Sequence, residues 1–382
     1  MTQSQLQTLV AERPVFDAHA DSLQRALDMG HDLGVRGAGH LDVERGREGG
    51  LGALVFVSWV DPKFIAQGPG AANRRTRDLL REFHRLARRH PDRVGFAGNS
   101  QQLDAARARG ALAGIPGIEG GHSIENDIGE LEWFFAHGVR VLTLVWNNHL
   151  TWIRSCQAGA GADIPEGLSD LGREIVRRMN QLGMLIDLSH AGRKSFFDAL
   201  DTTDRPVIAS HSGCTAIRAH QRNLDDEQLR ALAQNGGVVG IVFCTAFLDA
   251  DAQSSEDSLR KSDAYKAIGG ANDSAQFVAQ SEFLQRELAP LSIERVLDHT
   301  CHAIEIAGIE HVGIGSDFDG IQRTPQGLES ASCYMNLAAG LMRRGLALDD
   351  VRKVLGGNMR RVYAAATGPG TSAATATLEP LD

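Results

Sequence analysis

Short apolar runs alternate with amphipathic stretches along most of the chain. The stretches 170–182, 225–234 and 293–307 place apolar residues at helical spacing. Runs without polar interruption are typical of strands buried on both faces, as in parallel sheets. Eight such runs occur, at 15–18, 53–60, 111–118, 139–145, 184–188, 206–209, 238–243 and 311–315. Eight strand–helix units predict an α/β fold, a TIM (β/α)8 barrel.

The predicted barrel forms one domain, because no linker divides residues 1–367. Glycine commonly ends a helix, and glycines mark the predicted turns from helix to strand at Gly110, Gly138, Gly183, Gly236 and Gly308. The one long interruption, 245–290, is polar with acidic and serine-rich parts, and long segments of this kind usually act as lids or binding loops. The Ala/Thr-rich end, 368–382, is predicted to be a disordered tail.

The composition limits the kinds of partner and the cellular location that we expect. The net charge of -9 argues against nucleic acid and anionic membranes, which favour basic surfaces. The arginine-rich run 74–89 also carries apolar residues at helical spacing, so we interpret it as the solvated face of an amphipathic helix. No apolar window is long enough for a membrane span or a signal peptide. The five scattered cysteines predict no disulfide framework, and together these features favour a cytoplasmic location.

Polar residues with catalytic potential gather where the predicted strands end. In a barrel of this type the carboxyl ends of the strands meet at one rim, where active sites lie. Five strands end in motifs with histidine or acid: Asp17-Ala18-His19-Ala20-Asp21, Gly117-Ile118-Glu119-Gly120-Gly121-His122, Asp187-Leu188-Ser189-His190, Ala209-Ser210-His211-Ser212 and Gly315-Ser316-Asp317-Phe318-Asp319. We therefore expect these side chains to converge.

Five of these side chains suit a metal centre: His19, Asp21, Glu119, His190 and His211. His19 and Asp21 are two residues apart on a strand and so point to the same face. Imidazoles and carboxylates are costly to bury without partners. Together they suit Zn²⁺, and other transition metals also fit. Because five ligands exceed what one tetrahedral zinc needs, two metals that share Glu119 would use them economically.

Two neighbouring residues offer alternatives. His122 could compete with Glu119 as a ligand, but it follows two glycines and so lies beyond the strand. Asp17 shares the spacing of His19. We interpret Asp17 as a supporting or structural acid.

The same motifs, in the same order, resemble the membrane dipeptidase (renal dipeptidase) family of zinc metallopeptidases. The resemblance also covers Arg222-Asn223 and extends from Val15 to about Ile321, and Asn358-Met359-Arg360-Arg361 fits it as well. Six short motifs in register over about 300 residues are specific. That family belongs with the amidohydrolase-like barrels, so the resemblance implies the same fold.

The resemblance implies a binuclear site with two zinc ions per chain. His19 and Asp21 would bind one zinc, His190 and His211 the other, and Glu119 would bridge them. Arg222 matches the arginine that holds the substrate's carboxylate end, and Asp317 matches the acid that shuttles a proton. The resulting hypothesis is that a metal-bridging hydroxide attacks the peptide bond of a dipeptide while Asp317 passes the proton to the leaving amine.

One segment departs from the family pattern. The family often has a substrate-contacting histidine after the fourth strand, in a Leu-Thr-Leu-Thr-His pattern. Here Trp146 occupies that position, and His149 follows three residues later. His149 could replace the histidine, or Trp146 could form an apolar wall, so this departure bears on substrate preference.

Three alternatives stay open. A related metal-dependent amidohydrolase would act on N-acyl amino acids, cyclic amides or lactones. A non-catalytic metal-binding barrel would be expected to have lost a ligand or Asp317, and none is missing. A cysteine hydrolase built on Cys214 near His211 lacks a separate base. A homodimer is the default expectation for the assembly.

Overall fold

Eight parallel strands form the closed barrel that the alternating pattern predicts. The structure is a computed structural model that describes residues 2–368. The barrel strands are β1 (Val15–Ala20), β2 (Leu51–Trp59), β4 (Leu112–Glu119), β5 (Val141–Thr143), β6 (Leu185–Asp187), β7 (Ile208–Ser212), β8 (Val238–Ile241) and β9 (Val312–Ile314). They follow the order β2-β1-β9-β8-β7-β6-β5-β4. The ring closes because β2 also pairs with β4, from Ala53↔Ala113 to Trp59↔Glu119.

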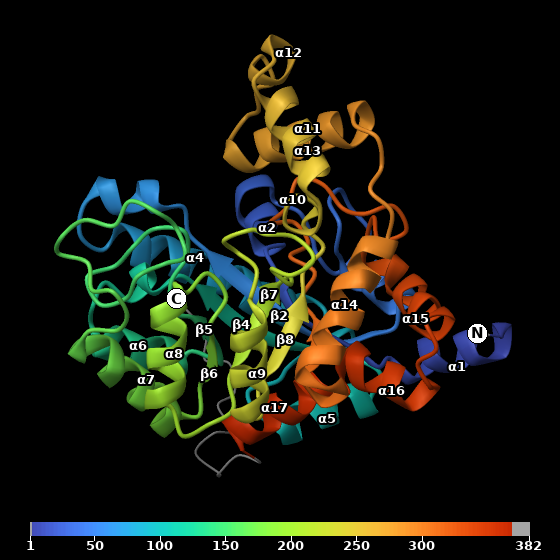
Figure 1. Cartoon of the computed structure of the whole chain (residues 1–382), viewed down its shortest axis with the longest axis horizontal. Helices are drawn as coiled ribbons and strands as arrows, with labels where there is room; N and C mark the ends of the chain where they lie inside the picture. The colour runs from blue at the N-terminus through green and yellow to red at the C-terminus, as the bar shows by residue number, and fades with distance from the viewer. Residues whose placement is uncertain (1, 369–382) are drawn as a thin grey trace.

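Helices surround the barrel and extend beyond its mouth (Figure 1). They are α1 (Gln3–Glu12), α2 (Leu23–Met29), α3 (Val43–Glu48), α4 (Ala71–Arg89), α5 (Ser100–Ala108), α6 (Ile128–Ala136), α7 (Asp170–Leu182), α8 (Arg193–Thr202), α9 (Asp226–Gln234), α10 (Thr245–Leu248), α11 (Ala250–Arg260), α12 (Asp263–Lys266), α13 (Asp273–Glu287), α14 (Glu294–Ala307), α15 (Tyr334–Arg343), α16 (Leu348–Arg352) and α17 (Asn358–Thr367). Short helical turns lie at η1 (Pro62–Gln67), η2 (Gly121–Ile124), η3 (Ile309–His311), η4 (Ala331–Cys333) and η5 (Lys353–Gly357). The predicted helix 170–182 coincides with α7.

One strand is absent from the apolar pattern. β3 (Val94–Phe96) pairs with the amino half of β4, whereas β5 pairs with its carboxyl half. β3 is three residues long and Gly95 interrupts its apolar character. It is therefore too short for the hydrophobic pattern to distinguish it from a turn.

The amino end of the barrel is closed by α17, which contacts β1, β6, β8 and β9. Met359, Val362 and Tyr363 are buried there in a cluster with Phe16 and the first residues of β5, β6, β7 and β8. Figure 1 shows α17 beneath the strands and α10 to α13 at the opposite end. The barrel is therefore a filled core with one accessible end, the carboxyl end of the strands.

The interruption at 245–290 is not a loop, because it folds into α10, α11, α12 and α13. Its polar residues include helix caps: Asp249 accepts from the first turn of α11, Ser262 from α12 and Asn272 from α13. Such side chains bond the backbone N–H groups that a helix start leaves free. The acidic and serine-rich character of this segment therefore partly reflects helix boundaries.

Three further expectations concern the chain as a whole. In the described part of the chain, no helix is long and apolar enough to cross a membrane. All five cysteines lie within the described residues and are free thiols, as predicted. The predicted tail 368–382 lies outside the described residues except for Gly368.

Candidate metal centre

The five predicted ligands meet at the mouth of the barrel. His19 belongs to β1, Glu119 ends β4 and His211 belongs to β7, whereas Asp21 directly follows β1 and His190 comes three residues after the end of β6. All five are at most 5% exposed. Parallel strands bring their carboxyl ends to one rim, which explains why residues far apart in sequence converge.

Glu119 lies between the histidines and faces them with different oxygens. Its Oε1 is 2.9 Å from Nε2 of His190 and 3.3 Å from Nε2 of His211. Its Oε2 is 3.6 Å from Nε2 of His19. One oxygen of the carboxylate thus faces His190 and His211, and the other faces His19.

Two of the predicted ligands, His19 and Asp21, present atoms that the described residues do not satisfy. Nε2 of His190 and Nε2 of His211 lie 3.0 Å apart. Among the described residues, Nε2 of His19 and Oδ1 of Asp21 are buried without a hydrogen-bond partner. Such orphaned atoms are costly. The sets His19, Glu119, His211 and His19, Asp21, Asp317 each place one ligand atom per residue within 4.8 Å of the others. The donor chemistry and the unsatisfied atoms therefore fit divalent metal ions.

Nearby charges shift the pKa values of the three histidines in different directions. Burial lowers the pKa of His19, but the facing carboxylates of Glu119 and Asp21 outweigh burial and hold this pKa well above its ordinary value. Burial and the nearby Arg222 guanidinium lower the pKa of His190 to about 4. Burial and the charge of His19 lower the pKa of His211 well below its usual range. Both shifts favour the neutral imidazole at His190 and His211, which is the form that binds a metal ion.

A buried hydrogen-bond network orients the imidazoles from behind. Ser210 Oγ lies 2.8 Å from Nδ1 of His211 and 3.4 Å from Nδ1 of His19, and it donates to Asp187 at 2.6 Å. Asp187 also accepts from the Thr143 hydroxyl and from the backbone of Ser210. Groups that bond the second ring nitrogen fix the orientation of a ligating histidine.

The remaining ring is held by a residue that the sequence analysis did not single out. Asn147 Oδ1 lies 2.9 Å from Nδ1 of His190. The sequence also assigned no role to Asp187 and Ser210. Like Asn147, they support the imidazoles through contacts between strands, which the sequence does not specify. The polar character of Asp187 and Ser210 inside apolar strands was the available signal.

Two residues of the centre have left-handed backbone conformations. The φ angle is 66° at His190 and 62° at Asp317. Residues other than glycine rarely adopt this region, and such strain concentrates at functional sites. Gly320 is required here for space, because a Cβ atom at this position would lie 2.2 Å from Asp21 Oδ2 and 2.4 Å from Asp317 Oδ1.

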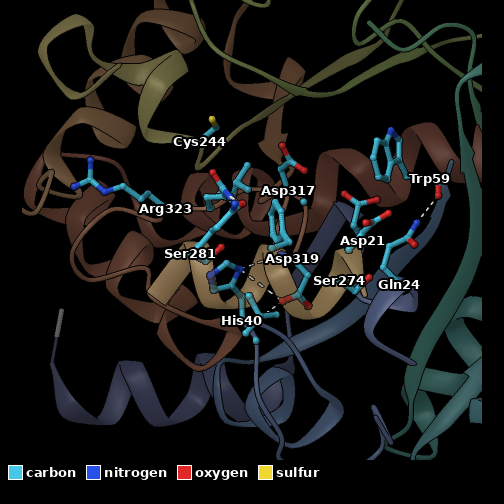
Figure 2. A pocket seen from close by; sticks show the side chains of 18 of the residues that line it. Asp21, Gln24, His40, Trp59, Cys244, Ser274, Ser281, Asp317, Asp319 and Arg323 are labelled. Carbon is cyan, nitrogen blue, oxygen red and sulfur yellow. Dashed lines mark hydrogen bonds and ion pairs between the residues drawn. The ribbon is translucent and has the colours of Figure 1, made fainter. Parts of the chain in front are cut away.

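Asp317 and Asp319 differ in their partners although both are buried. Asp319 accepts from Arg25 at 2.7 Å and from the backbone N–H of His40 at 2.7 Å, and also from the Ser22 hydroxyl. Figure 2 shows Asp319 joined to His40, with Asp317 apart from both. Burial raises the pKa of Asp317 well above its usual range, whereas Arg25 and His40 outweigh burial and lower the pKa of Asp319. His40, which appeared unexceptional in sequence, thus anchors the loop that carries Asp317.

A cavity of about 1360 Å³ opens above the centre. Arg222 lines it, is 3% exposed, donates to His211 O at 3.2 Å and lies 5.3 Å from the Phe247 ring centroid. Trp146 also lines it. His149 is not among the lining residues, and its Nδ1 instead accepts from the backbone of Ser155 at 3.2 Å.

The alternatives at nearby positions occupy structural roles. His122 Nε2 lies 2.8 Å from the backbone oxygen of Val60. Asp17 accepts from the backbone of Ser316 at 2.9 Å and from the Tyr334 hydroxyl, which ties β1 to the segment after β9. Cys214 is fully buried, and burial raises the pKa of its thiol to about 12. A thiol in this state is a poor nucleophile.

A closed (β/α)8 barrel with histidine and carboxylate side chains clustered at its mouth is an architecture suited to a metal-dependent hydrolase. Sequence comparison narrows this class. The profile of the membrane dipeptidase family, peptidase family M19, matches residues 3–374. The chain therefore belongs to the membrane dipeptidase family and is a metallo-dipeptidase.

Individual relatives agree with this family. Dipeptidase tcpJ of Claviceps purpurea is 32% identical over 330 residues, which cover 85% of this chain and 69% of that protein. The crystal structure of a dipeptidase of family M19 is 28% identical, with a TM-score of 0.76 over 93% of this chain and 99% of the other. A Rhodobacter sphaeroides metallopeptidase bound to a phosphinate mimic of L-Ala-D-Ala is 26% identical, with a TM-score of 0.75 over 92% and 99%.

Proposed function

We propose that this metallo-dipeptidase cleaves dipeptides with a free C-terminus at a site for two zinc ions bridged by Glu119. The position of Glu119 carries this proposal, because a carboxylate with one oxygen toward His190 and His211 and the other toward His19 suits a bridging ligand. His19 and Asp21 would hold one ion, and His190 and His211 the other. The two unsatisfied atoms of His19 and Asp21 support the first assignment.

Bound zinc would supply a water of lowered pKa and a Lewis acid for the peptide carbonyl. The protein's own contribution is to hold reacting groups in place. Ser210 and Asn147 keep the imidazoles turned toward the mouth. The low exposure of the ligand side chains reduces solvent screening, which strengthens the electrostatic interactions of the centre.

Asp317 is our candidate for the acid that takes the proton from the attacking water and returns it to the leaving amine. It lines the cavity, and its carboxylate belongs to the same group as His19 and Asp21. Asp319, by contrast, is held by Arg25, His40 and Ser22. A proton-transfer group must be within reach of the reacting atoms, and of these two acids only Asp317 belongs to the ligand cluster.

Arg222 is our candidate for the group that binds the substrate carboxylate. Its guanidinium is buried beside the centre, and its Nε has no hydrogen-bond partner among the described residues. A planar guanidinium matches a carboxylate with two parallel hydrogen bonds. A fixed carboxylate site close to the metals favours short substrates.

The 245–290 segment is proposed to act as a lid that limits substrate length within the single catalytic domain 1–367. Residues of α11 and α13 line the cavity together with the metal centre. Arg323 Nη1 contacts Glu256 Oε1 of α11 at 3.2 Å, and both side chains are buried. This ion pair connects the helical cover to the segment that carries Asp317.

Metal analysis combined with hydrolysis assays tests the proposed function. We expect about two zinc ions per chain, cleavage of simple dipeptides, loss of cleavage with a chelator and recovery on adding zinc. N-acyl amino acids and cyclic amides serve as competing substrates. Cleavage of those compounds without cleavage of any dipeptide would contradict the proposal. The homodimer expected from the sequence stays a prediction, which light scattering measures.

A further inference from the structure

Two tryptophans form one wall of the cavity next to Glu119. Trp59 is the last residue of β2 and pairs in register with Glu119 on β4. Trp146 follows β5, the neighbour of β4 on its other side. The two ring centroids lie 5.1 Å apart with an interplanar angle of 60°, and both residues line the cavity. We call this pair the tryptophan wall.

Trp59 of the tryptophan wall and Arg222 lie on opposite sides of the mouth, and Trp146, which follows β5, lies between them along the rim. β2 and β7 are separated by four steps around the eight-stranded ring in either direction. Arg222 follows β7 and contacts Phe247, which follows β8. Figure 2 shows Trp59 at the end of the cavity near Gln24 and Asp21, with Cys244, shortly after β8, toward the other end. The metal centre therefore lies between an arginine and an aromatic surface.

We propose that the tryptophan wall binds the side chain of the N-terminal residue of the dipeptide and selects large apolar residues there. This inference rests on the proposed function, in which Arg222 holds the C-terminal carboxylate. An extended dipeptide spans about 7 Å. With its carboxylate on Arg222 and its peptide bond at the metals, its N-terminal residue extends across the mouth toward Trp59, with Trp146 beside it.

The size and character of the cavity agree with a bulky apolar side chain. Its volume of about 1360 Å³ exceeds the range of about 300–1000 Å³ usual for small-molecule sites. Aromatic rings offer a large apolar surface at little entropic cost. In an apolar subsite, a single methylene group changes kcat/KM by about tenfold or more.

The wall is held in place before substrate binds. Gln24 donates a side-chain hydrogen bond to the backbone oxygen of Trp59, and the Trp59 ring packs against the apolar cluster of the barrel. Trp146 lies 6.1 Å from the His190 ring, between centroids. A preorganised surface of this kind contributes to selectivity because little ordering is needed on binding.

The test compares Leu-Gly, Gly-Leu and Gly-Gly as substrates of the zinc-loaded enzyme. We expect the wild type to prefer Leu-Gly over Gly-Gly. Trp59→Ala and Trp146→Ala should each lower that kcat/KM ratio by about tenfold and leave the ratio of Gly-Leu to Gly-Gly unchanged. Trp59→Phe keeps an aromatic face and should retain most of the preference.

Trp133→Ala is the matched control. Trp133 belongs to α6, its ring centroid lies 3.7 Å from that of His137, and it is not among the residues that line the cavity. It should leave both ratios unchanged. A purely structural role of the wall would lower all three activities equally and would overturn the inference, as would absence of a preference in the wild type. Failure of the wild type to cleave any of the three dipeptides would instead refute the proposed function.

Discussion

The two ends of the barrel use buried polar residues in different ways. At the amino end, Asn358 donates to the backbone oxygens of Ile309 at 2.7 Å and Val312 at 2.8 Å. Arg140 at that end donates to Gly98 O at 2.7 Å. At the carboxyl end, His19 and Asp21 keep buried atoms without partners among the described residues.

This difference separates stability from function within one fold. Satisfied polar groups hold elements together, and the strained and unsatisfied ones are maintained only because the surrounding structure is stable enough to hold them. The amino end therefore supports the mouth, where free ligand atoms are available for metals. Substitutions at the two ends should have opposite consequences for activity and stability.

The largest effect is expected from Glu119→Gln, which keeps the shape of the proposed bridge but removes its charge. We expect kcat/KM to fall by at least about ten-thousandfold, because both metals contribute several kcal/mol of transition-state stabilisation. Elemental analysis should show less than the full metal content. A variant with full metal content and near-normal turnover would contradict the bridging role.

Asp317→Asn should separate catalysis from metal binding. We expect kcat to fall by about a thousandfold, the usual range for a lost general acid–base group, with the zinc content unchanged. The measurement is steady-state hydrolysis of a dipeptide alongside metal analysis of the same sample. Near-normal hydrolysis would refute the proton-transfer role.

Ser210→Ala tests whether the network behind the imidazoles tunes the metals. It removes the hydroxyl that contacts His211, His19 and Asp187. We expect zinc affinity to weaken by about tenfold or more, measured by competition with a chelator. Ser100→Ala is the control, because within the described residues the Ser100 hydroxyl donates to Gly368 O, away from the mouth. Equal affinities in the two variants would exclude the tuning role.

The smallest effect on activity is expected at the amino end. Asn358→Ala leaves two buried carbonyl groups without their donor, so the free energy of unfolding should fall by about 2 kcal/mol. At a temperature where the variant is folded, kcat/KM should match the wild type. Denaturant unfolding and dipeptide assays measure the two quantities. Loss of activity in the folded variant would show that the two ends are not independent.

Much of this protein could be predicted from local sequence. Continuous apolar runs predicted all eight barrel strands, because strands buried on both faces are mostly apolar. The position of His19, Glu119, His190 and His211 at strand ends predicted a common site, since parallel strands share a carboxyl edge. β3 was not predicted because it is short. The segment 245–290 was interpreted as a loop because the polar residues that cap its helices are also typical of loops.

Other features depended on contacts between residues far apart in the chain. No spacing rule indicates that Ser210 and Asp187 support the imidazoles, that His40 anchors Asp319, or that Trp59 lies beside Glu119. Side chains alternate between the two faces of their own strand, so the sequence determined which residues face inward at the mouth. Register between strands, and the closure of the ring through β2 and β4, decided which of them touch.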